Sequence, residues 1–279
     1  MDEELFLKSG KASFAGQRQP FMKSGEDVLA ESLTPLNLPD VQEVEFETNF
    51  IKTAVCELRF PTLLEFEAKP PVQLQKELRR DYPYYEPAQA VSVGPAVVDR
   101  EARYLFRSRK KDWTVSFRAS AIALETSRYT NFEEFSQRLE NLFRKSRSLL
   151  DTDFFTRVGL RYIDEIRIED GDLAGWVRDD LVIPLSQGIY GTVEHILQEV
   201  RGFTALGRYT FRHGMVGSAQ ARDKVYSLDF DLYGENVPFD SALSMVSQFN
   251  QQSFRFFSWA IGPKARTRLG KATAKHRGT

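Results

Sequence analysis

The sequence predicts an α+β fold: a curved, mostly antiparallel β-sheet packed on two long α-helices. Strand-like alternation of apolar and polar residues recurs between residues 43 and 233. The segments 131–150 and 240–261 instead carry apolar residues at helical spacing. Strands and helices do not alternate one by one along the chain, and this order disfavours a parallel sheet.

The segment Phe154–Ile168 is predicted to be the central strand. Its even positions from Val158 to Ile168 are apolar except for Asp164, and several of its odd positions are charged. A carboxylate on a buried face is costly unless it is partnered, so we expect Asp164 to pair with an arginine. Arg59, Arg118 and Arg161 are the candidates by position. A functional role for this acid is the alternative, because perturbed carboxylates concentrate at sites.

The first part of the chain predicts one strand, one short helix and a meander. Residues 43–60 alternate like a strand that Pro61 ends, and Pro71 suits the first turn of a short helix. Residues 91–126 resemble a β-meander. Within it the apolar positions change parity at 119–121, which suggests a bulge.

The second part begins with the clearest helix. Asn131 and Glu134 form a capping box, and an apolar stripe follows to residue 150. After the central strand, residues 169–191 are expected to cross over. Asp240 is the expected N-cap of the last helix, which Gly262 and Pro263 end. Three further strands are expected between these helices, at residues 193–206, 208–216 and 224–233.

Three regions are expected along the chain. Residues 1–42 lack periodicity and predict a flexible N-terminal arm, or alternatively a segment that folds on a partner. Residues 43–262 form the α+β domain, with possible related halves 43–170 and 171–262. Residues 263–279 form a basic C-terminal tail, and from Gly262 onward the chain has six Lys or Arg and no acid.

The bulk composition points to a cytoplasmic protein. The net charge is −1, and no apolar run is long enough to span a bilayer. The N-terminus lacks the apolar core of a signal peptide. A single cysteine, Cys56, excludes an intramolecular disulfide framework and fits a reducing compartment. We therefore expect no membrane association.

Metal-ligand spacing and catalytic motifs are absent from the sequence. The three histidines and one cysteine have no metal-ligand spacing, and no nucleophile or nucleotide-binding motif occurs. We expect no cofactor. Asp229 and Asp231 project the same way from one strand, and together with Asp164 they would offer oxygen ligands to Mg²⁺. A solvent-facing role for Asp229 and Asp231 is the simpler interpretation.

Two groups of basic residues provide a possible nucleic-acid interface. A solvated tail and a charged hairpin turn would have the same composition. The candidate residues are Arg107, Arg109, Lys110, Lys111, Lys264, Arg266 and Arg268.

Three short motifs, Cys56–Pro61, Val158–Asp164 and Leu228–Asp231, resemble those of a sporadically distributed family of uncharacterised bacterial proteins. A closing Phe-rich helix adds to the resemblance, which covers about Val44 to Gly262. Family members tend to have Asn at the position of Asp164 and often His near the position of Asn250. The resemblance implies patchy occurrence, as in mobile or defence-associated genes, and no known reaction.

The resulting function hypotheses fall into three classes. The first is a non-enzymatic protein that binds a protein partner, in a bacterial defence or toxin–antitoxin-like system. The second is a nucleic-acid-binding protein, and the third is a metal-dependent enzyme built on Asp164, Asp229 and Asp231. A small-molecule pocket is a further option. The candidate functional residues are Arg59, Arg161, Tyr162, Asp164, Asp229 and Asp231.

Overall fold

A computed structural model describes residues 34–93, 98–169, 171–216 and 224–274. The described part of residues 35–279 forms one compact unit. Residues 1–33, most of the predicted arm, lie outside it, as do residues 275–279 of the predicted tail.

The fold is α+β, as predicted, and is built on a large antiparallel sheet. The described residues form nine strands in the order β3-β4-β5-β6-β2-β7-β10-β9-β8. Each adjacent pair is antiparallel. The sheet is not strongly curved, contrary to the expectation. The strands are β2 (Ile51–Arg59), β3 (Tyr84–Val93), β4 (Val98–Arg107), β5 (Trp113–Arg118), β6 (Ala121–Thr126), β7 (Phe154–Ile168), β8 (Gln198–Thr204), β9 (Gly207–Val216) and β10 (Lys224–Pro238).

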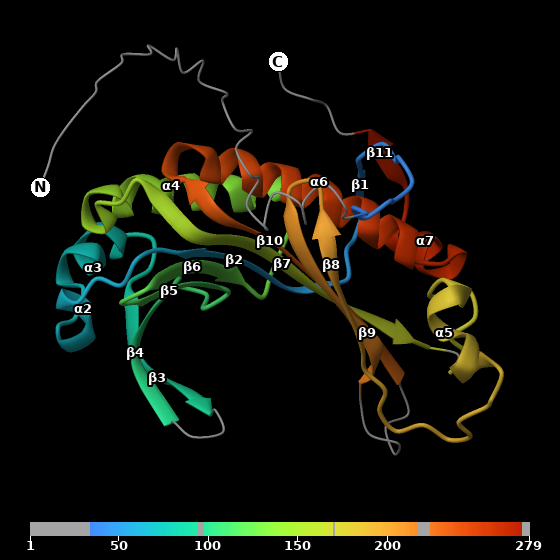
Figure 1. Ribbon diagram of the computed structural model, residues 1–279. Coiled ribbons are helices and arrows are strands. Elements are labelled where there is room, and N and C mark those ends of the chain that lie inside the picture. The colour runs from blue at the N-terminus through green and yellow to red at the C-terminus, as the bar shows by residue number, and fades with distance from the viewer. Residues whose placement is uncertain (1–33, 94–97, 170, 217–223, 275–279) are drawn as a thin grey trace, which may run out of the picture. The chain divides into compact units, whose positions relative to one another are not determined.

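Two 19-residue helices, α4 (Phe132–Leu150) and α6 (Ala242–Ala260), cover one face of this sheet (Figure 1). The described residues also form four short helices, α2 (Glu65–Ala68), α3 (Val72–Leu78), α5 (Asp179–Ser186) and α7 (Pro263–Leu269). Of these, α3 is the short helix expected after Pro71, and the other three were not predicted. A 3₁₀ turn, Phe239–Ser241, leads into α6.

The order of elements repeats. The first set consists of β2, short helices, a meander and α4. The second set consists of β7, a crossover with α5, another meander and α6. In each set the last strand pairs with the first, since β6 pairs with β2 and β10 pairs with β7. The sets meet where β2 pairs with β7. In this topology β7 begins the second set. The halves 43–170 and 171–262 stay a prediction.

Several local predictions are confirmed. β7 spans the predicted Phe154–Ile168. Oδ1 of Asn131 accepts a 2.9 Å hydrogen bond from the backbone N–H of Glu134 and caps α4. Buried Phe143 and Leu139 on the apolar stripe of α4 pack into the core beside Phe155 of β7.

Two local predictions are wrong. The parity change at 119–121 marks a hairpin turn rather than a bulge, because Arg118 of β5 pairs with Ala121 of β6. The first meander therefore has four strands, β3 to β6. Asp240 does not cap the last helix; it lies in the 3₁₀ turn and pairs with Arg147 at 3.2 Å.

The predicted basic tail contains regular structure. After α7, the strand β11 (Ala272–Ala274) pairs with β1 (Val44–Phe46) in a separate two-stranded sheet. Leu269 of α7 is buried in the core. The described end of the predicted arm also packs on the domain, since the Leu36 N–H donates a 2.8 Å hydrogen bond to the Phe203 carbonyl.

The helices of the described residues include none with the length and apolarity needed to cross a membrane.

Candidate functional site

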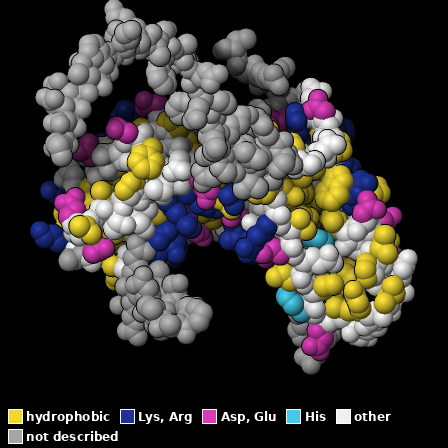
Figure 2. All heavy atoms as spheres, in the orientation of Figure 1, with side chains coloured by type: hydrophobic (Ala, Val, Ile, Leu, Met, Phe, Trp, Pro, Cys, Tyr) yellow, Lys and Arg dark blue, Asp and Glu magenta, His cyan; other side chains and the backbone are white. Residues whose placement is uncertain are grey.

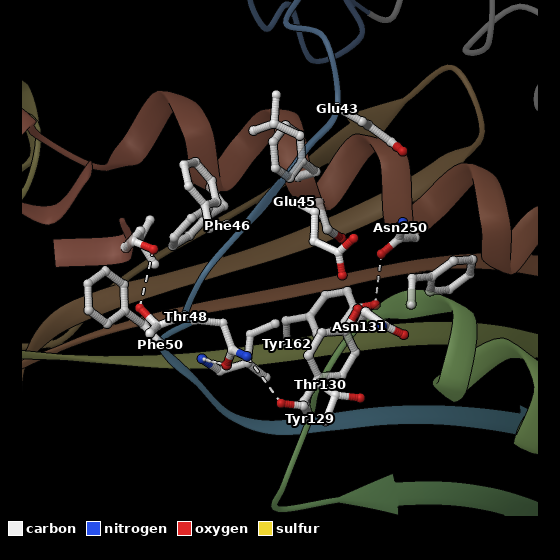
Figure 3. Close-up of a pocket in the computed structure, with 18 of the residues that line it drawn as sticks. Glu43, Glu45, Phe46, Thr48, Phe50, Tyr129, Thr130, Asn131, Tyr162 and Asn250 are labelled. Atoms are coloured by element: carbon white, nitrogen blue, oxygen red, sulfur yellow. Dashed lines mark hydrogen bonds between the residues drawn. The ribbon is translucent and has the colours of Figure 1, made fainter. Parts of the chain in front are cut away.

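A cavity of about 610 Å³ lies between α6, the start of α4 and the middle of β7 (Figure 3). The segment of residues 43–51 lines its opposite side. The residues that line the cavity are Glu43, Val44, Glu45, Phe46, Glu47, Thr48, Asn49, Phe50, Ile51, Tyr129, Thr130, Asn131, Phe132, Glu133, Tyr162, Asp164, Phe230, Asn250, Ser253, Phe254, Phe257, Leu269 and Thr273.

An irregularity in β2 creates the wall formed by residues 43–51. Ile51 pairs with Asp164, and the register shifts between Ile51 and Thr53. Such a shift bends a strand, and here the chain leaves the sheet and continues to β1 beside α6. The Thr48 N–H donates to the Leu269 carbonyl at 3.1 Å, and Nδ2 of Asn49 donates to the Tyr129 carbonyl at 3.1 Å. These bonds hold the segment of residues 43–51 to α7 on one side and to the loop before α4 on the other.

Asp164 is the most unusual residue of the cavity. Its side chain belongs to the helix-facing side of β7, and the residue is only 3 % exposed. Burial, together with the nearby charge of Asp229, raises the pKa of Asp164 to about 8. Within the described ranges its carboxylate has no hydrogen-bond or ion-pair partner. A ligand in the cavity would therefore meet an acid that is mostly protonated at neutral pH.

Polar groups of β7, α6 and the turn before α4 converge beside Asp164. The Tyr162 hydroxyl donates a 2.9 Å hydrogen bond to Oδ1 of Asn250, as Figure 3 shows. The Tyr129 ring lies edge-on to that of Tyr162, with ring centroids 5.5 Å apart. Burial raises the pKa of both tyrosines, so both hydroxyls stay neutral. The buried Ser253 hydroxyl, on α6, has no hydrogen-bond partner among the described residues.

Carboxylates surround this group. The charges of Asp164, Glu45 and Glu43 add to the rise in the Tyr129 pKa, which means that all three lie near its hydroxyl. Figure 3 shows the Glu45 carboxylate directed toward the two tyrosine rings. Glu47 and Glu133 also line the cavity, whereas its lining residues include no Lys, Arg or His.

The predicted arginine partners of Asp164 are wrong. Arg161 donates two 2.7 Å hydrogen bonds to Asp229. Arg59 pairs with Glu57 at 2.6 Å, and Arg118 lies 3.7 Å from the same carboxylate. These side chains belong to the other sheet face, because residues of alternate parity point to opposite sides. Figure 2 shows basic and acidic side chains gathered on the face turned away from the helices.

The proposed cluster of three carboxylates does not form. Leu228 pairs with Asp164 and Asp229 pairs with Ile163, so Asp229 and Asp231 lie on the face opposite Asp164. The described residues contain no group of three His, Cys, Asp or Glu side chains that could hold a metal ion. The solvent-facing interpretation is also wrong for Asp229, which is only 6 % exposed and is paired with Arg161.

The basic residues proposed for nucleic acid lie on separate elements. Arg109, Lys110 and Lys111 form the β4–β5 turn, whereas the other group belongs to α7, at the opposite side of Figure 1. Part of this charge is already neutralised or used within the fold. Arg107 pairs with Glu86 at 2.8 Å, and Lys111 lies 3.8 Å from the same acid.

On α7 the basic side chains also have internal contacts. Arg266 donates to the Ser258 carbonyl, and Arg268 lies 3.5 Å from Glu169. Lys264 packs its aliphatic stem against Gly175. The two groups therefore do not form one continuous basic surface.

Of the candidate functional residues predicted from the sequence, the cavity contains Tyr162 and Asp164. The sequence did not identify Tyr129, Ser253 or the acids of residues 43–47 as functional candidates. One signal was available on α6, because Asn250 and Ser253 are polar residues within its apolar stripe. No comparable pattern marks Tyr129, which reaches the cavity from the loop before α4.

No protein-family model matches this chain, and no curated protein matches it at a significant level.

Proposed function

We propose that this chain is a non-enzymatic binding protein and that its site for a small molecule is the Asp164 cavity. The observation that carries the proposal is an unpartnered, buried carboxylate facing a cavity of about 610 Å³. Buried polar groups without partners each cost about 1–3 kcal/mol. A ligand that supplies those partners recovers this free energy on binding.

The composition of the walls also supports a ligand site. Small-molecule pockets are mostly apolar and carry a few convergent polar groups that orient the ligand. Here Phe46, Phe254 and Phe257 provide apolar surface, and Asp164 and Ser253 provide polar groups. The cavity volume lies within the range of about 300–1,000 Å³ typical of such pockets.

The test is a thermal-shift screen with a panel of cationic, neutral and anionic compounds. Ser253→Leu fills the floor of the cavity, and Thr273→Trp covers its rim from an exposed position. Compounds that raise the melting temperature of the wild type are expected to lose that effect in both variants. Glu165→Gln is the matched control, since Glu165 adjoins Asp164 but lies on the other face.

Two results would overturn the proposal. One is a panel in which no class of compound stabilises the wild type. The other is stabilisation that survives in both Ser253→Leu and Thr273→Trp, because the compounds would then bind elsewhere.

A protein partner, as predicted from the sequence, is the second candidate and is favoured by a different surface. Ile189, Tyr190, Leu197 and Val200 are each about half exposed or more, between 47 % and 66 %. Contiguous exposed apolar surface is typical of interaction sites. Figure 2 shows hydrophobic side chains gathered at the lower right of the molecule.

The partner hypothesis predicts that a protein co-purified from the native host is lost with Tyr190→Ser and Leu197→Ser. Binding of the purified partner to the purified wild type, but not to the double variant, would support it. Retention of the same partner by the double variant would exclude this surface. The defence or toxin–antitoxin setting and the cytoplasmic location stay predictions from the sequence.

A further inference from the structure

We propose that the ligand of the Asp164 cavity is an organic cation, an ammonium group attached to an apolar body. This inference rests on the proposed binding function and names the chemical class of its ligand. It depends on the unpartnered buried acid Asp164, on the acidic residues around the cavity and on its aromatic walls.

The charges of the cavity all have one sign. Five acidic residues line it, and the described residues of the lining include no Lys, Arg or His. Low-dielectric walls strengthen the field of such a group and concentrate counter-ions. The effect of Asp164, Glu45 and Glu43 on the Tyr129 pKa places that field inside the cavity, next to the rings.

The walls are rich in aromatic rings, which attract cations through their faces. Phe46 stacks on Phe254 with centroids 6.4 Å apart, and Phe50 lies 6.5 Å from Phe257. The rings that line the cavity are Phe46, Phe50, Tyr129, Phe132, Tyr162, Phe230, Phe254 and Phe257. They provide apolar surface for the body of the ligand and ring faces for its charge.

Among the described residues, cations of the chain lie over aromatic rings outside the cavity. Arg138 lies over Trp113 and Arg157 lies over Tyr233, each 4.4 Å from the ring centroid. Acids and aromatic rings meet in this cavity, and an external cation would interact with both.

The start of α4 is the one feature that would favour an anion, because helix N-termini carry partial positive charge. The positive partial charge of that helix end is already partly compensated within the chain. Asn131 accepts the N–H of Glu134, and Glu133 and Glu134 place two negative charges in the first turn. An anionic ligand would therefore face the carboxylates without compensation.

Binding of a cation is coupled to the proton on Asp164. The empty site holds Asp164 mainly as the neutral acid at pH 7, since its pKa is about 8. A cation beside it favours the carboxylate, so the proton leaves to solvent as the ion pair forms. Tyr129 and Tyr162 stay neutral, and Asp229 on the far face is already paired with Arg161. Affinity for the cation should therefore rise with pH up to about 8 and then level off.

The test is isothermal titration calorimetry with choline and its neutral isostere 3,3-dimethylbutan-1-ol, and with 2-phenylethylammonium and phenylacetate. For the wild type we expect each cation to bind at least about tenfold more tightly than its uncharged or anionic counterpart. Titration in phosphate and in Tris, which differ in ionisation enthalpy, should reveal the released proton at pH 7.

Asp164→Asn keeps the shape of the side chain and removes its charge. It should weaken both cations by about tenfold or more, abolish proton release and leave 3,3-dimethylbutan-1-ol unaffected. Glu165→Gln should behave as the wild type. Glu45→Gln, at an exposed position, is a second test that does not disturb the core, and it should weaken only the cations.

The results separate the two proposals. Equal affinity for choline and its isostere, or a preference for phenylacetate, would overturn the cation inference while the cavity remained a binding site. Unchanged cation affinity in both Asp164→Asn and Glu45→Gln would also overturn it. If no compound of any charge bound in the cavity, the proposed function would fail as well.

Discussion

The Tyr162 hydroxyl on β7 donates a 2.9 Å hydrogen bond to Oδ1 of Asn250 on α6 and joins the sheet to the helix beside Asp164. Asn250 belongs to α6 and Asp164 to β7. The structure brings both to one cavity, although they are far apart in sequence. A change at either position therefore alters the surroundings of the other.

Loss of the Tyr162 hydroxyl should destabilise the junction of β7 and α6. Tyr162→Phe keeps the ring and leaves Oδ1 of Asn250 without its donor, at a cost of about 1–2 kcal/mol in the free energy of unfolding. Chemical denaturation measures this difference. Tyr85→Phe, at a tyrosine that is 43 % exposed, should change stability by less than about 0.5 kcal/mol. Equal losses in the two variants would contradict a role for the bond.

Asp164 should make the protein less stable as the pH rises. Its pKa is about 8 when folded, against 3.8 for an unperturbed Asp, so from pH 4 to pH 8 the folded chain binds a proton that the unfolded chain lacks. The free energy of unfolding then falls by up to about 1.4 kcal/mol per pH unit and levels off above pH 8. Burial lowers the pKa of His213 below 6.5, which gives the opposite slope in more acidic solution. The effect of Asp164 on stability can therefore be measured apart from that of His213 between pH 6.5 and pH 8.

Asp164→Asn should remove that slope and stabilise the ligand-free protein, by up to about 5 kcal/mol at pH 8. Denaturation curves at several pH values between 6.5 and 8 provide the measurement. Glu165→Gln should keep the wild-type slope. An unchanged slope in Asp164→Asn would mean that Asp164 is not the group with the raised pKa.

The buried acid of the other face should behave differently from Asp164. Asp229 accepts two hydrogen bonds from Arg161 and lies 3.4 Å from Arg212. Asp229→Asn should therefore destabilise the protein by about 2 kcal/mol, because two partly buried cations lose their partner. Asp231→Asn should cost about 1 kcal/mol, since the Asp231 side chain is 21 % exposed, against 9 % for Asp229. Denaturant midpoints of both variants measure this order.

Divalent metal ions should not stabilise the protein. Asp164 lies on one face of the sheet and Asp229 and Asp231 lie on the other, so they cannot share one ion. We expect millimolar Mg²⁺ and a chelator to give the same melting temperature. Stabilisation by Mg²⁺ that Asp229→Ala abolished would contradict this arrangement and revive the metal site.

Cys56 should be chemically inert in the native protein. It is fully buried in β2, and burial raises the pKa of its thiol to about 12. A thiol reagent such as iodoacetamide should label it only after denaturation, as mass spectrometry would show. Rapid labelling of the folded chain would mean that β2 opens locally.

Where one local pattern had two structural causes, the sequence alone could not choose between them. A change of apolar parity at 119–121 fits a bulge and a tight hairpin equally, and the pairing of Arg118 with Ala121 decides for the hairpin. The segment after Gly262 has the composition of a solvated tail. It forms α7 and β11 because Leu269 reaches the core and β1 offers a free strand, and short elements depend on such packing for stability.

By itself the sequence determined the α+β class, the limits of the central strand, the cap and stripe of α4, and the anomaly of Asp164, since these follow from periodicity and local hydrogen bonding within a few residues. Tertiary structure decided what surrounds Asp164. The strand register sends Arg161, Asp229 and Asp231 to one face and Asp164 to the other, where Asn250, Ser253 and Tyr129 meet it. Contacts between residues so far apart depend on strand register and helix docking, which no local pattern encodes.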